Sequence, residues 1–179
     1  QEYREFDAES PWEGTKYIIQ EEDKNQTKVI IGNFSIGTLV WFFLKKPIGI
    51  LYIDGPASVI TQNRAIIERE EECRLQVVEC CLSAGTGKQF TNTVTDFSIA
   101  AGASVNYVRI QDRDFGHTSV NRVNALLEKN TIFNHNGFDL GGALTRNDIV
   151  TEIAGKDALV NLNGLYLASA AQHIDNHTI

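Results

Sequence analysis

The sequence predicts an all-β fold in which two-strand units stack into a β-solenoid. Three observations support this: a repeat of 27–30 residues runs through the later part of the chain, its strands alternate apolar and polar residues, and no long amphipathic helix interrupts them. A fixed period of about 20–50 residues indicates units that cannot bury an apolar face alone and therefore stack. We expect roughly five rungs about 4.8 Å apart.

The chain divides into an N-terminal extension of mixed or irregular structure, residues 1–45, and a β-helix core, residues 46–179. The first 14 residues are acidic, and Pro11 prevents a continuous helix there. Short strands are expected at 17–19 and 29–31, whereas the apolar run 34–44 fits a strand or a short helix equally.

Repetition organises everything after Pro47. One family of segments places a turn with Gly or acidic residues before a strand, at 70–79, 101–110, 128–137 and 155–164. Aligning these on Cys73, Ala103, Thr131 and Ala158 gives steps of 30, 28 and 27 residues. A second family of strands lies between them, at 90–99, 118–127, 144–153 and 172–179. Each repeat therefore holds two strands and two turns.

The alternation within the strands predicts one buried and one wet face. Val160 and Leu162 alternate with asparagines, whereas in 105–110 the set Asn106, Val108 and Ile110 is the more apolar at its end. Asn136-Gly137 and Asn163-Gly164 are expected at turns, because both residue types tolerate a left-handed backbone. A jelly roll or another sandwich is the alternative fold, since two-strand repeats also form successive hairpins.

Composition excludes several function classes. A net charge of −7, with no basic cluster longer than Lys45-Lys46, argues against nucleic-acid binding. No apolar run approaches the roughly 18 residues of a membrane span. The adjacent Cys80 and Cys81 must point to opposite faces of a strand, which suits a reducing compartment and predicts a cytoplasmic protein.

Few motifs carry chemistry. The Ala84–Lys88 stretch resembles the end of a phosphate-binding loop, but Gln89 follows where Ser or Thr is required, so we interpret it as a surface turn. The three cysteines lack zinc-site spacing and are expected to be buried, inert thiols. His117 and His135 receive no role. We expect no catalytic, metal-binding or cofactor-binding residue in this chain.

His173, Asp175 and His177 alternate along the last strand and therefore share one face. The two histidines would lie about 13 Å apart along a strand, too far to bind one metal ion together. We interpret the three side chains as a polar ladder on an outer face or at a subunit contact.

GGALTRNDIV (141–150), NLNGLYL (161–167) and QHIDNHT (172–178) together resemble the core of the SufBD family, and the last of these resembles its SufD branch more than its SufB branch. This resemblance extends over about residues 46–179 and implies a right-handed parallel β-helix, with His173, Asp175, Asn176 and His177 in the family signature. It also implies a scaffold role in the SufBCD machinery that builds iron–sulfur clusters, without enzymatic activity or a cofactor bound by this chain alone.

The expected partners are SufB-like and SufC-like subunits, the latter an ATPase, or a second copy of the chain; neither nucleic acid nor a membrane is expected. In the family, the SufC-binding helical region follows the β-helix, so we expect the solenoid to be C-terminally truncated at Ile179. The alternatives are a β-helix enzyme acting on acidic polysaccharide, with Asp112, Arg113 and Asp114 as its compact candidate residues, and a strand-rich interaction module without a role in cluster assembly.

Overall fold

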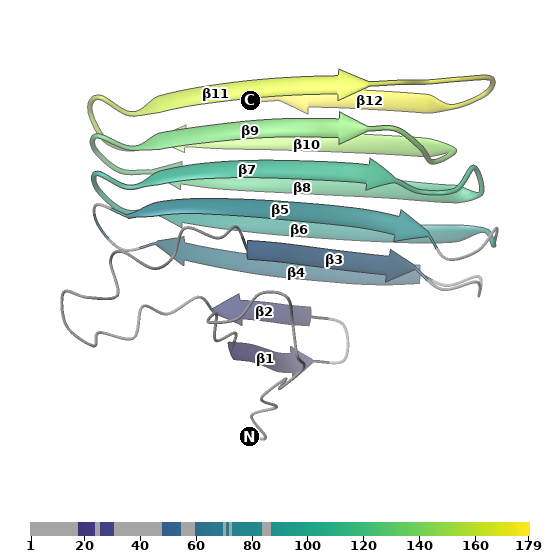
Figure 1. Ribbon diagram of the computed structural model, residues 1–179, viewed down its shortest axis with the longest axis horizontal. Coiled ribbons are helices and arrows are strands. Elements are labelled where there is room, and N and C mark those ends of the chain that lie inside the picture. Colours follow the sequence, from purple (N-terminus) through teal and green to yellow (C-terminus); the bar gives the residue numbers. More distant parts are fainter. Residues whose placement is uncertain are drawn as a thin grey trace.

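The protein folds as a column of paired strands. The computed structural model describes residues 18–23, 26–30, 48–54, 60–69, 71, 73–83 and 87–179. Within these ranges every regular element is a strand, and no helix long and apolar enough to cross a membrane occurs in them. Figure 1 shows the strand pairs stacked one above another. The prediction of an all-β solenoid is therefore confirmed.

Two parallel five-stranded sheets form the column among the described residues. The first sheet consists, in spatial order, of β3 (Ile48–Asp54), β5 (Arg74–Ser83), β7 (Ser104–Asp112), β9 (Ile132–Asp139) and β11 (Leu159–Tyr166). The second sheet consists of β4 (Ile60–Arg69), β6 (Gln89–Ile99), β8 (His117–Leu127), β10 (Leu144–Ile153) and β12 (His173–Thr178). The chain alternates between the sheets, so each rung contributes one strand to each.

The register of the strands confirms the repeat alignment. Arg74, Ser104, Ile132 and Leu159 lie side by side in the first sheet, directly after the four residues on which the repeats align. The expected strands of this first family begin three or four residues too early, because each segment opens with the preceding turn. Repeat alignment also missed the first rung, β3 and β4, whose sequence does not follow the later pattern.

A tight turn recurs with the repeat before the first-sheet strands. Gly102, Asn130 and Asp157 occupy the same place in successive turns, with φ of 73°, 57° and 59°. The prediction of turns at Asn136-Gly137 and Asn163-Gly164 is wrong. Both pairs lie side by side within β9 and β11, where the Asn163 amide donates to Asn136 Oδ1 at 3.1 Å. Stacking of identical amides in neighbouring rungs offsets the weak strand preference of Asn and Gly.

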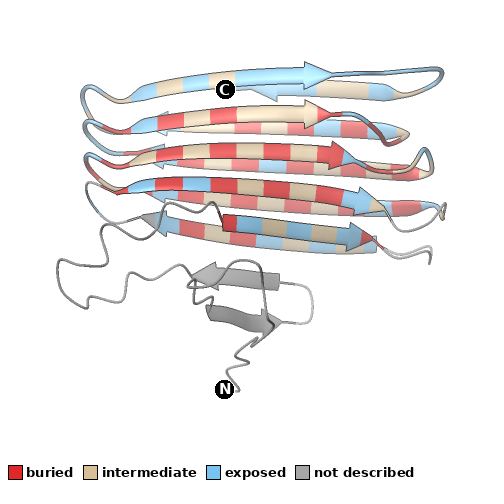
Figure 2. Ribbon diagram, viewed as in Figure 1, coloured by how far each residue is buried: buried red, intermediate tan, exposed pale blue. Residues whose placement is uncertain are grey.

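The interior between the sheets is apolar at one end. Alternate residues of every central strand are buried, as the striping in Figure 2 shows. Phe97 from the second sheet packs its ring 4.9 Å from that of Tyr107 and 5.3 Å from that of Phe133, both in the first sheet. These aromatic contacts join successive rungs as well as the two sheets, so the core is continuous along the column.

A short hairpin lies at the N-terminal end. β1 (Ile18–Asp23) and β2 (Gln26–Ile30) pair antiparallel, and β2 lies against β4. The strands expected at 17–19 and 29–31 are thus present in their described residues. The acidic segment 1–14 and the apolar run 34–44 lie outside the described residues.

The interior aromatics should dominate stability. Phe133 has no exposed surface, so we expect Phe133→Ala to lower the free energy of unfolding by about 3–5 kcal/mol. Phe90, which points outward and is 37% exposed, provides the matched control, and Phe90→Ala should cost only about 1 kcal/mol. Urea denaturation followed by circular dichroism measures both. Equal losses would contradict the assignment of inner and outer faces.

Candidate functional site

Charged and polar side chains fill the other end of the column interior. They project from the carboxyl ends of the first-sheet strands and the amino ends of the second-sheet strands. Glu79, Cys81, Arg109 and Asp139 follow the buried apolar residues at the same alternate positions, so the strand pleat that buries Val77 also buries them. The alternate positions that are apolar at one end of each strand are therefore polar or charged at the other end, and both sets face the interior.

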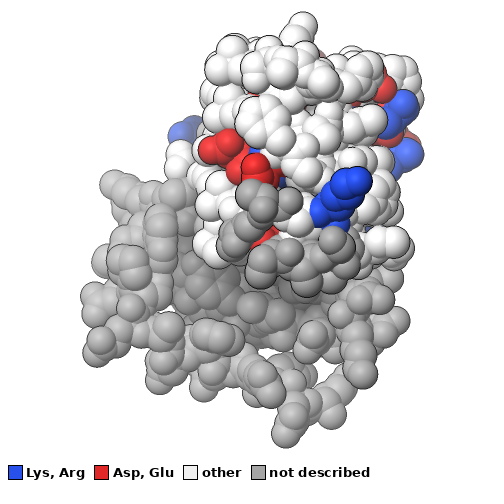
Figure 3. Space-filling view, turned by 90° about the vertical axis from the view of Figure 1, so that its right-hand side faces the viewer, with Lys and Arg blue, Asp and Glu red and all other residues white. Residues whose placement is uncertain are grey.

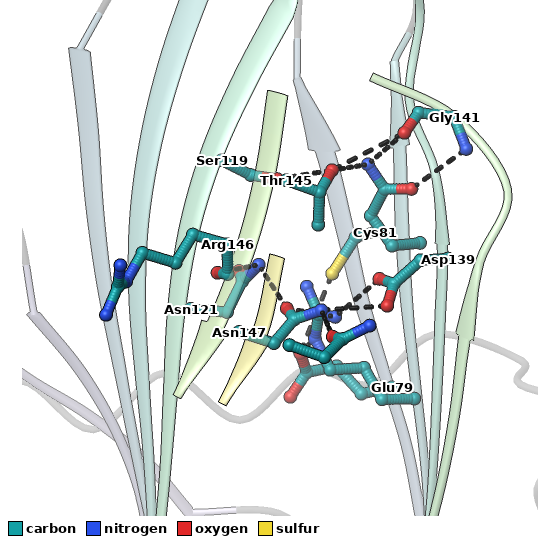
Figure 4. Close-up of polar contacts among 12 residues, drawn as sticks. Glu79, Cys81, Ser119, Asn121, Asp139, Gly141, Thr145, Arg146 and Asn147 are labelled. Carbon is teal, nitrogen blue, oxygen red and sulfur yellow. Dashed lines mark hydrogen bonds and ion pairs between the residues drawn. The ribbon is translucent and has the colours of Figure 1, made fainter. Parts of the chain in front are cut away.

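Arg109 forms the centre of this group. Its Nε lies 3.3 Å from Glu79 Oε1, and its Nη1 lies 3.3 Å from Asp139 Oδ1. The same Nη1 donates to Asn147 Oδ1 at 3.2 Å. Glu79 belongs to the preceding rung and Asp139 to the following rung, so one guanidinium joins three rungs. Figure 4 shows the side chains of Glu79, Asp139 and Asn147 converging between the two sheets.

The Glu79 carboxylate is fully buried and accepts three further hydrogen bonds. Tyr107 Oη donates to Oε2 at 2.8 Å, Thr95 Oγ1 donates to the same oxygen at 3.3 Å, and Cys81 Sγ lies 3.6 Å from Oε1. Burying a carboxylate is costly unless its oxygens are paired, and here both oxygens are. We call Glu79, Cys81, Arg109, Asp139 and Asn147 the interior polar cluster.

Burial sets the protonation of this cluster. It raises the pKa of the Cys81 thiol to about 11, although Arg109 opposes the shift, so Cys81 is protonated at neutral pH. Burial also raises the pKa of Asp139 above its ordinary value, against the opposing effect of Arg109. For Arg109 itself burial alone would lower the pKa, but Cys81, Glu79 and the other acidic neighbours raise it above its ordinary value. A protonated, enclosed thiol is a poor nucleophile and a poor metal ligand.

A second buried group lies at the turns beside this cluster. Arg113 Nε lies 2.7 Å from Asp54 Oδ2, although the two residues are 59 positions apart in the chain. His117 Nδ1 lies 3.1 Å from Gln89 Oε1, an acceptor, which assigns the ring proton to Nδ1 and leaves Nε2 to accept from Thr91 Oγ1 at 2.8 Å. Burial, together with Arg113 and against Asp54, lowers the pKa of His117 to about 4, so its contact with Asp54 joins a neutral imidazole to a carboxylate.

Gln111 secures the turn between β9 and β10. Its Nε2 donates to Gly141 O at 3.0 Å, and its Oε1 accepts from Gly141 N at 3.1 Å. The Gln111 side chain thus bonds both backbone polar groups of Gly141, as a neighbouring strand would do in a sheet. Gly141 packs so closely on the Arg113 backbone that a Cβ there would overlap it. The polar end of the column is consequently closed by its own turns.

The four family-signature residues divide between two faces. His173, Asp175 and His177 lie on the outer face of the second sheet, which confirms their predicted common face. Asp175 pairs with Arg146 at 3.0 Å, and His177 Nδ1 lies 3.6 Å from Asp148. Asn176 points inward, where its Oδ1 accepts from Asn147 Nδ2 at 2.7 Å. Asn176 alone of the four therefore extends the interior polar cluster, into the last rung.

Sequence reasoning missed most of the buried charged residues. Arg113, grouped with Asp112 and Asp114 as the compact candidate residues of a polysaccharide-active enzyme, has a fully buried side chain, whereas Asp112 is exposed on the opposite side of the strand. The three therefore do not form one site. His117 and His135 are also buried. The two-residue alternation of the strands could have revealed them. Each buried charged residue lies an even number of positions from buried apolar residues of its strand or of the adjoining turn, and therefore on the same face.

The described residues contain no group of three His, Cys, Asp or Glu side chains arranged to hold a metal ion. An open groove of about 590 Å³ lies on the outside, lined by residues including Ile60, Phe90 and Phe115. No member of the interior polar cluster lines this groove, so it is not an entrance to the cluster. The Ala84–Lys88 turn is described only at Gly87 and Lys88, between β5 and β6.

Removal of the central cation should be far more damaging than removal of a surface one. Arg109→Met leaves two acidic groups buried without their cation, which costs about 3–5 kcal/mol. Adding Glu79→Gln should restore part of the loss, because one of the two unpaired buried charges is then removed. Arg146→Met is the matched control, with a much smaller loss because its partners are solvated. Urea denaturation of Arg109→Met, Glu79→Gln, the double variant and Arg146→Met tests this; additive losses for Arg109 and Glu79 would refute the pairing.

The buried histidines should make the fold sensitive to acid. Burial, with a smaller contribution from Arg109, lowers the pKa of His135 to about 4, as for His117. The unfolded chain therefore binds more protons between about pH 6.5 and pH 4, and stability is lost as pH falls through this window, by up to about 3 kcal/mol per histidine. The raised pKa of Asp139 partly offsets the loss near the acid end. We expect His135→Phe to flatten the dependence of unfolding free energy on pH, and an unchanged slope would contradict this.

Comparison with known proteins identifies the family. A family model described as "SUF system FeS cluster assembly, SufBD core domain" matches residues 51–179, most of the chain. Neither the curated proteins nor the solved structures gave a match. The matched range includes nearly all of the two-sheet column and both clusters. The chain therefore belongs to the SufBD core family of the SUF iron–sulfur cluster assembly system.

Proposed function

We propose that this chain is a SufD-type scaffold subunit of the SUF machinery, which pairs with a SufB-like subunit and the SufC ATPase. The observation that carries the proposal is the family match over residues 51–179, from within β3 to the last strand, together with the SufD-like sequence of residues 172–178. In this role the chain supplies a rigid column to its partners and leaves nucleotide hydrolysis to SufC.

The state of the interior supports a scaffold rather than an enzyme. Arg109 engages two buried acids, Glu79 accepts hydrogen bonds at both oxygens, and Cys81 is held as a thiol. Catalytic groups are instead expected within reach of a substrate, with a pKa near the working pH. These side chains bind one another inside the column and so hold the rungs rigidly together. A platform for other subunits requires such rigidity.

We propose further that the chain alone binds no cofactor and that the iron–sulfur cluster is the cargo of the assembled complex. A cytoplasmic location is supported by the three cysteines, none of which forms a disulfide. The net charge of −7 supports protein partners over nucleic acid. The outward-facing residues of the signature strand, His173, Asp175 and His177, are the residues we assign to a subunit contact.

A polysaccharide-active β-helix enzyme is less well supported. Such a site needs a solvent-facing set of acids for calcium and a base for proton abstraction. Arg113, the basic residue nearest to the exposed Asp112, is committed to Asp54 inside the column. A strand-rich interaction module without a role in cluster assembly is the other alternative, and the experiment below separates it from the first.

The test is copurification followed by reconstitution. We expect the full chain, co-expressed with SufB-like and SufC-like proteins of the same source, to retain both through affinity purification. Removing it should slow cluster formation from iron and sulfide by about tenfold or more. Asp175→Ala with His177→Ala should weaken retention, whereas Asn134→Ala on the opposite sheet should not. A folded chain that retains neither partner would refute the proposal. Retention without an effect on cluster formation would favour the simple interaction module.

A further inference from the structure

The outer face of the first sheet carries a line of apolar side chains that runs across the strands. Leu51, Cys80, Ile110, Phe138 and Leu165 lie side by side in consecutive rungs of this sheet. Leu51 is 58% exposed and Leu165 is 50% exposed, and the three between them are partly exposed. The line therefore extends along the full height of the column, and no described residue packs over it.

A second line lies beside the first, towards the turns. Ile53, Leu82 and Asp112 are in register along β3, β5 and β7, and Leu140 and Leu167 directly follow β9 and β11. All five are exposed, Ile53 and Leu167 at 60% each. We call these two lines together the outer apolar stripe.

The row next to the stripe on its other side contains Val78, Val108, Asn136 and Asn163, and beyond this row lies a ladder of amides that is already satisfied. Asn134 donates to Asn106 Oδ1 at 2.6 Å, and Asn161 donates to Asn134 Oδ1 at 2.7 Å. Because these amides bond to one another, they compete little for a partner's polar groups. Five strands about 4.8 Å apart and two lines about 6.6 Å apart give a stripe about 25 Å long and about 12 Å wide with side chains. A patch of about 300 Å² is in the range that marks functional surfaces on monomers.

Asp112 is the one charged residue in the stripe. It lies in the middle of the second line, between Leu82 and Leu140, and its carboxylate has no ion pair or hydrogen bond to any residue that the structure describes. Figure 3 looks onto the turn end of the column, where acidic side chains lie left of centre and a basic side chain lies to their right. A carboxylate in an apolar surface favours an occupant that brings a cation to that point.

Size and charge argue against a second copy as this occupant. A stable interface needs about 800 Å² per partner, well over twice the area of the stripe. Two copies related by a two-fold axis that crosses the stripe at Asp112 would also bring the Asp112 carboxylates together, with no cation of the stripe between them. The occupant must therefore be narrower than a sheet and must carry positive charge.

We propose that the outer apolar stripe binds an amphipathic helix of a partner protein, with a Lys or Arg of that helix paired to Asp112. A helix about 10 Å wide matches the two lines, and about 16 residues at 1.5 Å per residue match the length. Its apolar anchors at i, i+3, i+4 and i+7 meet the side chains of successive rungs. The basic side chain lays its methylene stem on Leu82 or Leu140 and places its charge at Asp112. This surface is separate from the signature strand, so the proposal does not depend on the proposed function.

Cys80 provides a built-in reporter, because it is partly exposed in the first line whereas Cys73 and Cys81 are buried. The probe is a 16-residue helical peptide with leucines on one face and a single lysine at its border; the control peptide has glutamate in place of that lysine. We expect the lysine peptide to slow iodoacetamide labelling of Cys80 in the full chain about fivefold or more at saturation. Asp112→Asn should weaken the peptide's binding by up to about fivefold at low salt.

Two matched pairs complete the experiment. Ile110→Thr should weaken binding, whereas Asn134→Thr on the satisfied ladder should not; Asp114→Asn, off the stripe, should leave binding unchanged. Equal affinity for the lysine and glutamate peptides would overturn the proposal. So would a lack of protection of Cys80 at millimolar peptide. Sedimentation that reveals a dimer strengthened by Asp112→Asn would overturn it in favour of a second copy.

Discussion

Constant register between rungs is the constraint on which this structure depends. Each strand pairs in parallel with its counterpart one repeat away, so each side chain lies between the side chains at the equivalent positions of the rungs above and below. A charge placed inside one rung must then be neutralised by its neighbours. Arg109 meets this requirement with Glu79 below and Asp139 above. The register therefore converts a local sequence choice into a network that spans three rungs.

The period and the strand alternation were sufficient to predict the column. Alignment on Cys73, Ala103, Thr131 and Ala158 matches the observed pairing, since a two-residue pleat and a fixed repeat admit few registers. The prediction of turns at the Asn-Gly pairs failed because turn preference is a local property of the sequence. Their place within strands depends on amide stacking between rungs, which is a tertiary interaction. The first rung was missed because its sequence does not follow the later repeat.

The buried charges could not be predicted in the same way. Arg109 alternates with Asn106, Val108 and Ile110, and by hydropathy alone that second set is the more apolar at its end. The structure buries Arg109 because the two acids that pair with it come from other rungs, 30 residues away on each side. Of the signature residues, the sequence predicted the common face of His173, Asp175 and His177, but not the inward role of Asn176. The family itself was recognisable from its C-terminal segments.

Inside and outside thus have separate roles. The interior polar cluster links the rungs and reaches the last one through Asn147 and Asn176, while the outer faces remain available to partners. The most direct test of stacking in register is the distance between spin labels at positions 106 and 161, on the outer face two rungs apart, in a chain with Cys80→Ser. Parallel stacking places their backbones about 10 Å apart, so strong dipolar broadening is predicted. Labels more than about 20 Å apart would contradict the column.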